Sequence, residues 1–265
     1  MALITLSSDY GFKDPYRAMV HGVLATLAPE LKVLDLSHSM GPGNLIEAAF
    51  VIGHAYSAFP PATVHLILCG ELAGDGKWLA MELDGQYFIA ADNGVLSLLQ
   101  GARRAKAIHR VEIGEQAGTM FPGRDFLAKA AVHLAQGGAL SLLGKAVDRI
   151  KSLSMPKPNL DGGRRRIQGH VIYVDNYGNL ITNLKAQDLS EALHARSLEV
   201  HLPRNRSLSR IAWSYQDNPQ DGVLALINSL GLLEIAYRDA RSQEVNGASS
   251  LLGLGIMSEI SISYE

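Results

Sequence analysis

The sequence predicts an α/β domain with a largely parallel sheet, followed by a smaller, mainly antiparallel β domain. Three observations support this fold class. Up to about residue 150, short runs rich in Val, Ile and Leu alternate with helical patterns, as in a parallel sheet covered on both faces. Proline, glycine and charged residues then replace this periodicity over residues 152–166. After that segment, short strand-like runs dominate the chain.

The first domain is expected to contain three helices between short strands. Apolar residues recur at helical spacing over 16–27, 45–59 and 124–136, and Gly137 and Gly138 are expected to end the third helix. The expected strands of this domain are 2–6, 32–36, 63–69, 78–83, 87–90 and 107–113.

The second domain is expected to consist almost entirely of strands. We place the first domain at residues 1–152, a linker at 153–166 and the second domain at 167–265. The last strand alternates strictly, with Ile260, Ile262 and Tyr264 on one face, which is typical of a half-buried antiparallel strand. The expected strands here are 167–174, 179–182, 198–202, 208–215, 223–227 and 256–264.

The composition favours a globular protein with small partners. With 265 residues and 47% hydrophobic content the chain can build real cores. Its 24 basic and 26 acidic residues produce no field that would attract nucleic acid or an anionic membrane. The lone cysteine, Cys69, favours a reducing compartment, with cytoplasm as the default. No apolar run approaches the roughly 20 residues of a membrane span.

Two aspartates near the N-terminus are candidates for ligand binding. Asp9 follows the first expected strand and would lie at the carboxyl end of that strand, where open α/β sheets bind ligands. A carboxylate there can accept hydrogen bonds from both hydroxyls of a ribose. A helix N-cap or a turn aspartate is the alternative. Asp14, which precedes Pro15, is equally compatible with an ordinary N-cap.

Two further segments of the first domain carry polar groups, one in a turn after an expected strand and one before an expected helix. Asp92 and Asn93 lie in an Ala-Asp-Asn-Gly tract that by itself predicts only a turn. Arg124 lies at the start of the helix expected over 124–136, where backbone N–H groups favour anions. The alternative there is a plain cap, with Asp125 complementing the helix dipole.

The second domain contains a polar segment around an aromatic residue, between two expected strands. Asp175 could hold an ammonium group, Tyr177 could stack on a base, and Asn179 could offer its amide. A tight structural turn is the alternative. Further on, Ser229 and Leu230 belong to a polar turn followed by an apolar run. The nine histidines show no tight metal-ligand spacing, so no metal or other cofactor is predicted.

Taken together, these segments resemble the S-adenosylmethionine hydroxide adenosyltransferase family, whose relatives include fluorinating and chlorinating enzymes. The segments that carry the resemblance occur in family order: SSDYGFKDPY at 7–16, LDLSH at 34–38, EAAF at 47–50, FPPATVH at 59–65, ADNGVLS at 91–97, FPGRDF at 121–126, VDNYGNLITN at 174–183 and INSLGLLEIA at 227–236. The match spans almost the entire chain.

The resemblance implies a β-barrel-like second domain and a homotrimer that binds an adenosyl ligand at its subunit interfaces. It implies that Asp9 binds the ribose diol, that Asp175 binds the amino acid end, and that Tyr177 and Asn179 contact the purine or methionyl portion. The backbone around Leu230 would lie near the base. The remaining candidate contacts are Asp14, Asp92, Asn93, Arg124 and Ser229.

The resemblance also implies the reaction, which is displacement of neutral methionine from C5′ of S-adenosylmethionine by water. Family members handle that water with an aspartate, an arginine and a histidine. The corresponding positions hold Gly70, Lys77 and Pro122, so the catalytic residues are not identified.

Three functions stay open at this point. The chain could be a hydrolase with altered catalysis, a catalytically degenerate binder of S-adenosylmethionine or adenosine, or a halide-using enzyme, and we favour an enzyme. The halide function ranks last because the first domain leaves no room for the loop insertion of halogenating relatives. Glu71, Asp75 and His65 are nearby polar residues, so a rearranged water site is also compatible with the sequence.

Overall fold

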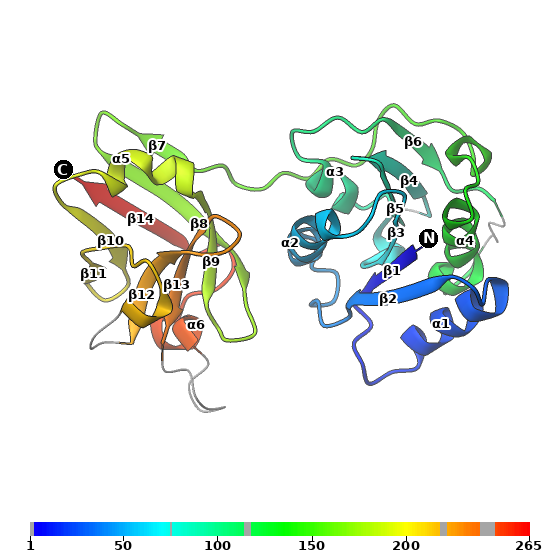
Figure 1. Cartoon of the computed structure of the whole chain (residues 1–265), viewed down its shortest axis with the longest axis horizontal. Coiled ribbons are helices and arrows are strands. Elements are labelled where there is room, and N and C mark those ends of the chain that lie inside the picture. Colours follow the sequence, from blue (N-terminus) through cyan, green and yellow to red (C-terminus); the bar gives the residue numbers. More distant parts are fainter. Residues whose placement is uncertain (1–2, 75, 114–117, 218–221, 239–246) are drawn as a thin grey trace. The chain divides into compact units, whose positions relative to one another are not determined.

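A computed structural model of the chain describes residues 3–74, 76–113, 118–217, 222–238 and 247–265. The chain divides into two compact units, Met1–Met155 and Pro156–Glu265. The first unit is α/β and the second is mainly antiparallel β, as Figure 1 shows for each unit by itself. The predicted fold class is therefore confirmed.

The first unit is built on a six-stranded sheet with the order β2-β1-β3-β5-β4-β6. Its parallel part comprises β2 (Lys32–Ser37), β1 (Leu3–Ser8), β3 (Val64–Leu68) and β5 (Gln86–Ala91). Strand β4 (Trp78–Leu83) runs antiparallel to both β5 and β6 (Ala107–Arg110). Every residue of β1 and β3 is buried, as expected for central strands covered on both faces.

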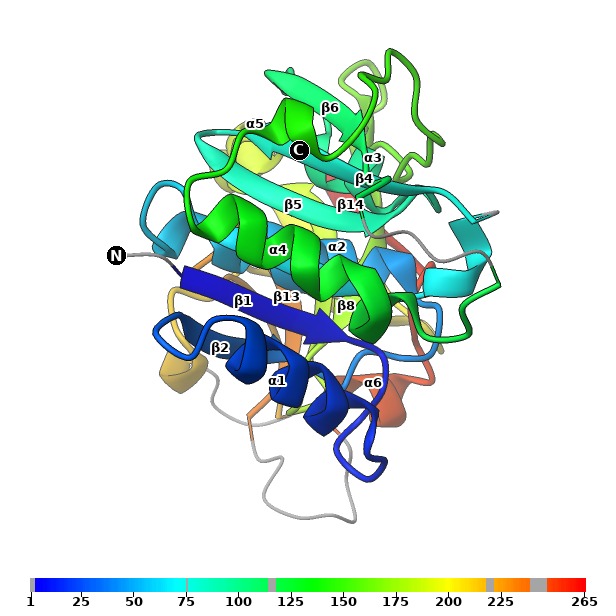
Figure 2. The same cartoon turned by 90° about the vertical axis from the view of Figure 1, so that its right-hand side faces the viewer.

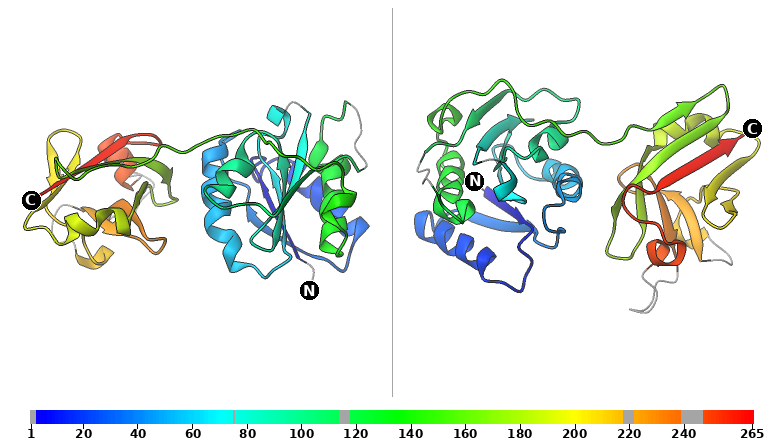
Figure 3. Two further views of the ribbon diagram at one scale, coloured as in Figure 1. Left: turned by 90° about the horizontal axis from the view of Figure 1, so that it is seen from above. Right: turned by 180° about the vertical axis from the view of Figure 1, so that it is seen from behind.

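Helices cover the two faces of this sheet. Helices α1 (Tyr16–Leu27) and α4 (Ala128–Ala135) lie on one face, and α2 (Leu45–Ala55) and α3 (Val95–Gln100) lie on the other (Figures 2 and 3). The two faces have separate cores, one centred on Phe126 and the other on Phe88. Asn44 caps α2 by accepting the backbone N–H of Glu47, which explains where that helix begins.

Two predicted helices differ from the structure at their ends. The helix expected over 45–59 ends at Ala55 and continues only as a 3₁₀ turn, Tyr56–Ala58. The helix expected over 124–136 opens with a π-helical turn, Gly123–Leu127, and becomes α-helical only at α4. The N–H of Ala128 reaches back to the carbonyl of Gly123, which widens this first turn.

The second unit is an eight-stranded, nearly closed, barrel-like sheet in which every strand pair is antiparallel. Its longest strand, β8 (Arg166–Val174), pairs with β14 (Glu259–Tyr264) and with β9 (Leu180–Lys185). The other strands are β7 (Asn159–Asp161), β10 (Leu198–Leu202), β11 (Arg206–Leu208), β12 (Val223–Ile227) and β13 (Leu232–Tyr237). Two short helices, α5 (Ser190–Leu193) and α6 (Gly247–Leu252), accompany the sheet.

Some predicted elements of the second unit were wrong or missing. The strand expected over 208–215 is wrong beyond Leu208, where Ala212 makes an isolated bridge to Leu226. The Asp217 carboxylate accepts the N–H groups of Trp213 and Ser214, so these two groups do not pair with another strand. Strand β13 was not predicted, and strand β7 falls within the segment expected to be the linker. Among the described residues, no helix has the length and apolar character needed to cross a membrane.

Candidate active site

The carboxylate of Asp9 is fixed at the carboxyl end of β1. Its Oδ2 accepts hydrogen bonds from the backbone N–H of Gly43 at 2.8 Å and from that of Gly70 at 3.0 Å. Gly70 follows β3, which is the parallel neighbour of β1 on the side away from β2. This is the point where the strand order reverses, and open α/β sheets bind ligands there. In the described part of the chain, both hydrogen bonds to this carboxylate reach Oδ2, which leaves Oδ1 for a ligand.

A pocket of about 770 Å³ opens beside Asp9. Its walls come from the chain after β1, the chain after β3, helix α1 and the segment before the π-helical turn. Three aromatic rings wall part of it, with ring centroids 5.7 Å apart for Tyr10 and Phe121 and 5.8 Å apart for Tyr16 and Phe121. The lining residues are Asp9, Tyr10, Tyr16, Met19, Gly70, Glu71, Leu72, Met120, Phe121, Pro122 and Arg124.

Glu71 brings a second carboxyl group to the same pocket. Its Oε1 accepts the backbone N–H of Gly123 at 2.7 Å, and its Oε2 accepts the hydroxyl of Tyr10. The side chain is buried, and burial raises its pKa to about 7, although the N–H of Gly123 acts in the opposite direction. The nearby carboxylates of Asp9 and Asp125 raise the pKa further. Glu71 therefore titrates near neutral pH.

The three positions expected to correspond to the family's water-activating residues lie in different surroundings. Gly70 and Pro122 line the pocket but offer no side-chain base. Lys77 is exposed and is not one of the residues that line the pocket. Of the other polar residues considered, His65 is buried in the sheet between Thr5 and Gln86, and Asp75 lies outside the described residues.

The other candidates of the first unit surround this pocket or lie away from it. Asn93 is buried and its amide donates to the carbonyls of Cys69 and Gly70, so it supports the loop after β3. Asp92 accepts the backbone N–H of Lys151, and it does not line the pocket. Asp14 is exposed and also lies outside the lining.

The expectation that Asp14 could cap the first helix with Pro15 at its first position was wrong. The N-cap of α1 is Pro15 itself, with no side-chain cap, so the helix begins one residue later than Asp-Pro predicts. Arg124, in contrast, lines the pocket. Its guanidinium lies 5.2 Å from the ring centre of Phe121, and its Nε donates to Asp125 at 2.6 Å.

In the second unit, the polar segment after β8 forms a tight loop. Asp175 Oδ1 accepts the N–H groups of Tyr177 and Asn179, and its Oδ2 accepts the side-chain amide of Asn179. Asn179 is buried and its Oδ1 also accepts the N–H of Tyr237. The Tyr177 side chain is 69% exposed, so it is available to stack on a ligand. Asp175 thus has the structural role of closing this loop.

The turn between β12 and β13 carries Ser229 and Leu230, both exposed. The N–H of Leu230 donates to the side chain of Asn228, which fixes the turn. Asn228 also donates to Glu234, a buried acid that sequence reasoning did not select. Burial raises the pKa of Glu234, although hydrogen bonds from Tyr215 and Asn228 lower it.

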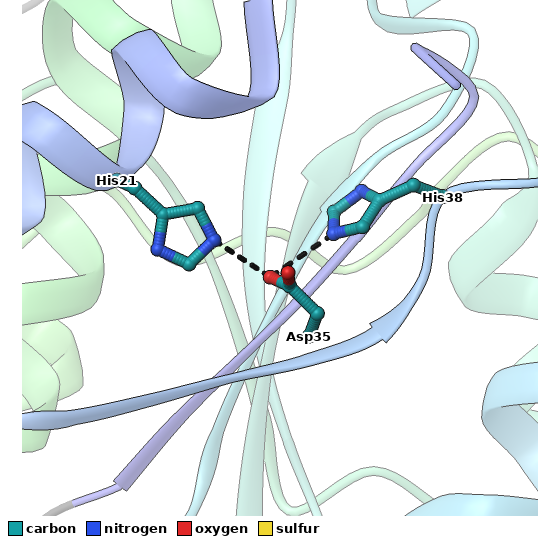
Figure 4. Close-up of side chains that lie close together, drawn as sticks. All are labelled: His21, Asp35 and His38. Carbon is teal, nitrogen blue, oxygen red and sulfur yellow. Dashed lines mark hydrogen bonds and ion pairs between the residues drawn. The ribbon is translucent and has the colours of Figure 1, made fainter. Parts of the chain in front are cut away.

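A second polar group of the first unit joins α1 to β2 (Figure 4). Asp35 Oδ1 lies 2.7 Å from Nε2 of His21 and 3.0 Å from Nε2 of His38, and Asp35 Oδ2 lies 2.5 Å from Arg17. His38 is fully buried with its Nδ1 on the hydroxyl of Ser8, and burial lowers its pKa. These donors could hold a metal ion, but Arg17 already neutralises Asp35, so we assign the group a structural role.

The fold and the pocket define a class of protein. It is a ligand-binding α/β unit with its pocket at the reversal point of a largely parallel sheet, followed by an antiparallel, barrel-like unit. Models of the SAM hydroxide adenosyltransferase N-terminal and C-terminal domains match residues 4–144 and 169–261. The chain belongs to the S-adenosylmethionine hydroxide adenosyltransferase family.

Similarity to two enzymes and to one solved structure supports the same family. The (R)-S-adenosyl-L-methionine hydrolase of Salinispora arenicola is 30% identical over 250 residues, which cover 91% of this chain and 92% of that protein. A fluorinase of Actinoplanes is 26% identical, covering 90% of this chain and 91% of the fluorinase. The crystal structure of an uncharacterized conserved protein from Thermotoga maritima has a TM-score of 0.87 and 28% identity, covering 98% of this chain and 99% of that one.

Proposed function

We propose that this protein splits S-adenosylmethionine into adenosine and methionine by attack of water at C5′. The observation that carries the proposal is the fixed carboxylate of Asp9 at the edge of the pocket. Two backbone N–H groups orient Asp9 before a ligand arrives, and a carboxylate in that state accepts both hydroxyls of a ribose. S-adenosylmethionine is the substrate in this proposal, and no resident cofactor takes part.

The pocket also suits the charge of the substrate. S-adenosylmethionine is a sulfonium cation, and the pocket combines the carboxyl groups of Asp9 and Glu71 with the rings of Tyr10, Tyr16 and Phe121. Aromatic faces and carboxylates both attract cations. The positive charge disappears as neutral methionine leaves, so a poorly solvating site favours the reaction.

A catalytically degenerate binder of S-adenosylmethionine or adenosine is the second candidate function. Gly70 and Pro122 favour it, because both line the pocket at positions where relatives are expected to carry water-activating side chains. Loss of acid/base assistance lowers rates by about 10²- to 10⁴-fold. The two functions differ in turnover and not in binding.

Incubation of the purified protein with S-adenosylmethionine, followed by chromatography, separates these functions. Release of equal amounts of adenosine and methionine supports hydrolysis, whereas saturable calorimetric binding without products supports the binder. A 5′-halo-adenosine formed in chloride or fluoride would support the halide function. Asp9→Ala should abolish binding, and Asp148→Ala is the matched control, because Asp148 is an exposed aspartate of the first unit that does not line the pocket.

We further propose that the protein is a cytoplasmic homotrimer in which Asp175, Tyr177 and Asn179 of one subunit complete the site of the next. The exposed ring of Tyr177 and the rigid loop around Asp175 support this role for the second unit. Light scattering after gel filtration tests the trimer. Tyr177→Ala should weaken S-adenosylmethionine binding without changing the folded state, because its side chain is largely exposed.

A further inference from the structure

Glu71 lies directly beside the positions where the pocket lacks a side-chain base. It is adjacent in sequence to Gly70, and its Oε1 is bound by the residue after Pro122. Gly70 and Pro122 line the same pocket as Glu71 and Asp9. A carboxyl group is therefore present where water would have to be handled, although it comes from a different residue than in relatives.

We propose that Glu71 is the catalytic base of this protein and takes the proton of the attacking water. This inference rests on the proposed hydrolysis of S-adenosylmethionine. The oxygen of water forms a bond to C5′ while the C5′–S bond breaks, and the electron pair of that bond stays on sulfur. The water proton passes to the Glu71 carboxylate and is later released to solvent. The products are adenosine, methionine with an uncharged thioether sulfur, and one proton.

The contacts of Glu71 leave it able to accept this proton. A carboxylate has about four acceptor sites, and within the described part of the chain one site on each oxygen is occupied, by the N–H of Gly123 and the hydroxyl of Tyr10. These two partners come from separate segments, the start of the π-helical turn and the chain after β1, and hold the carboxylate in one orientation. Fixed orientation is what a general base needs, because the proton must be within hydrogen-bond reach in the reacting geometry.

The titration of Glu71 agrees with this role. Burial raises its pKa to about 7. A general base is most effective when its pKa is near the operating pH, because it is then both largely deprotonated and basic enough to accept a proton. The charged groups around it are Asp9 and Asp125, which raise the pKa, and Arg124, which lines the same pocket. A bound sulfonium cation would favour the carboxylate form.

The test compares Glu71→Gln with wild type and with Glu82→Gln. Glutamine keeps an oxygen for the N–H of Gly123 but cannot accept the water proton. Glu82 is a matched control because it lies on β4, pairs with Lys106 and does not line the pocket. Glu71→Gln should lower the rate of adenosine release by about 10²- to 10⁴-fold. The Kd for S-adenosylmethionine should rise by a much smaller factor, because the pocket loses the attraction of one carboxylate but keeps Asp9. Glu82→Gln should match wild type in both.

The pH profile distinguishes a base from a merely structural glutamate. The wild-type kcat/KM should rise about tenfold for each pH unit below pH 7 and level off above it, and the slow residual activity of Glu71→Gln should not show this rise. A Glu71→Gln variant with the wild-type rate and pH profile overturns the role of Glu71. Wild-type protein that binds without turnover, or does not bind, overturns the proposed hydrolysis itself and the role of Glu71 with it.

Discussion

The buried carboxyl group of Glu71 should make the stability of the first unit depend on pH in a direction that can be predicted. In the folded chain this group keeps its proton up to about pH 7, because burial disfavours the charged form. In the unfolded chain it loses the proton near its ordinary pKa of 4.5. Between these values the folded state binds more protons, so the free energy of unfolding falls as the pH rises.

The size of the effect follows from the same two values. The interval from 4.5 to about 7, at about 1.4 kcal/mol for each pH unit, corresponds to a loss of about 3 kcal/mol. Glu71→Gln removes the ionisation. From pH 4 to pH 8, the difference in the free energy of unfolding between Glu71→Gln and wild type should therefore shift by about 3 kcal/mol in favour of the variant. This shift does not depend on which of the two proteins is more stable at pH 4.

Urea unfolding followed by tryptophan fluorescence measures this difference for the first unit alone. The chain has two tryptophans, of which Trp78 is buried against Phe126 in the first unit and Trp213 is 96% exposed in the second. In a Trp213→Phe background, Trp78 is the remaining reporter. If the difference between Glu71→Gln and its parent stays constant from pH 4 to pH 8, Glu71 is not a buried acid with a raised pKa and the reasoning fails.

Three further predictions concern stability. Gly123→Ala should lower the stability of the first unit by about 1–3 kcal/mol in the same urea assay, because its Cβ would lie 2.8 Å from Leu68 and 3.0 Å from Glu71; wild-type stability would contradict this. Burial acts to raise the pKa of Asp35, but hydrogen bonds from two imidazoles keep that pKa low. The free energy of unfolding should therefore fall as acid protonates Asp35, and Asp35→Asn should reduce this acid sensitivity. Asp175→Ala should lower the thermal midpoint of the second unit by several degrees in circular dichroism, because three hydrogen bonds close its loop; an unchanged midpoint would show that the loop forms without them.

Hydrophobic periodicity was sufficient to predict the fold class, because buried parallel strands and amphipathic helices leave strong patterns. It was insufficient where side chains compete with the backbone. In the second half of the strand expected over 208–215, Asp217 binds the backbone N–H groups of Trp213 and Ser214, and no periodic pattern records those contacts. Strand β13 was missed because its burial is continuous, and a short apolar run after a turn does not by itself indicate a strand.

The candidate site was predictable only in part, for a related reason. The position of Asp9 follows from chain order, because it comes directly after the first strand of the sheet. The importance of Glu71 depends on burial and on contacts with Tyr10 and Gly123, which are respectively 61 and 52 residues away in sequence. From sequence, Glu71 is one of three polar residues near the missing water-activating positions, with Asp75 and His65, and no pattern distinguishes it from the other two.

The structure gives a physical reason why residue 71, and not residue 70, would carry the proposed base. Gly70 has φ +57°, a left-handed conformation that favours glycine, and a Cβ there would lie 3.3 Å from the side-chain amide of Asn93. That amide is held by the carbonyls of Cys69 and Gly70, so it cannot move aside without losing two hydrogen bonds. A carboxylate at residue 70 would therefore destabilise the loop that positions Asp9. Residue 71 lies beyond this constraint, and its side chain reaches the pocket while the Gly70 N–H continues to hold Asp9.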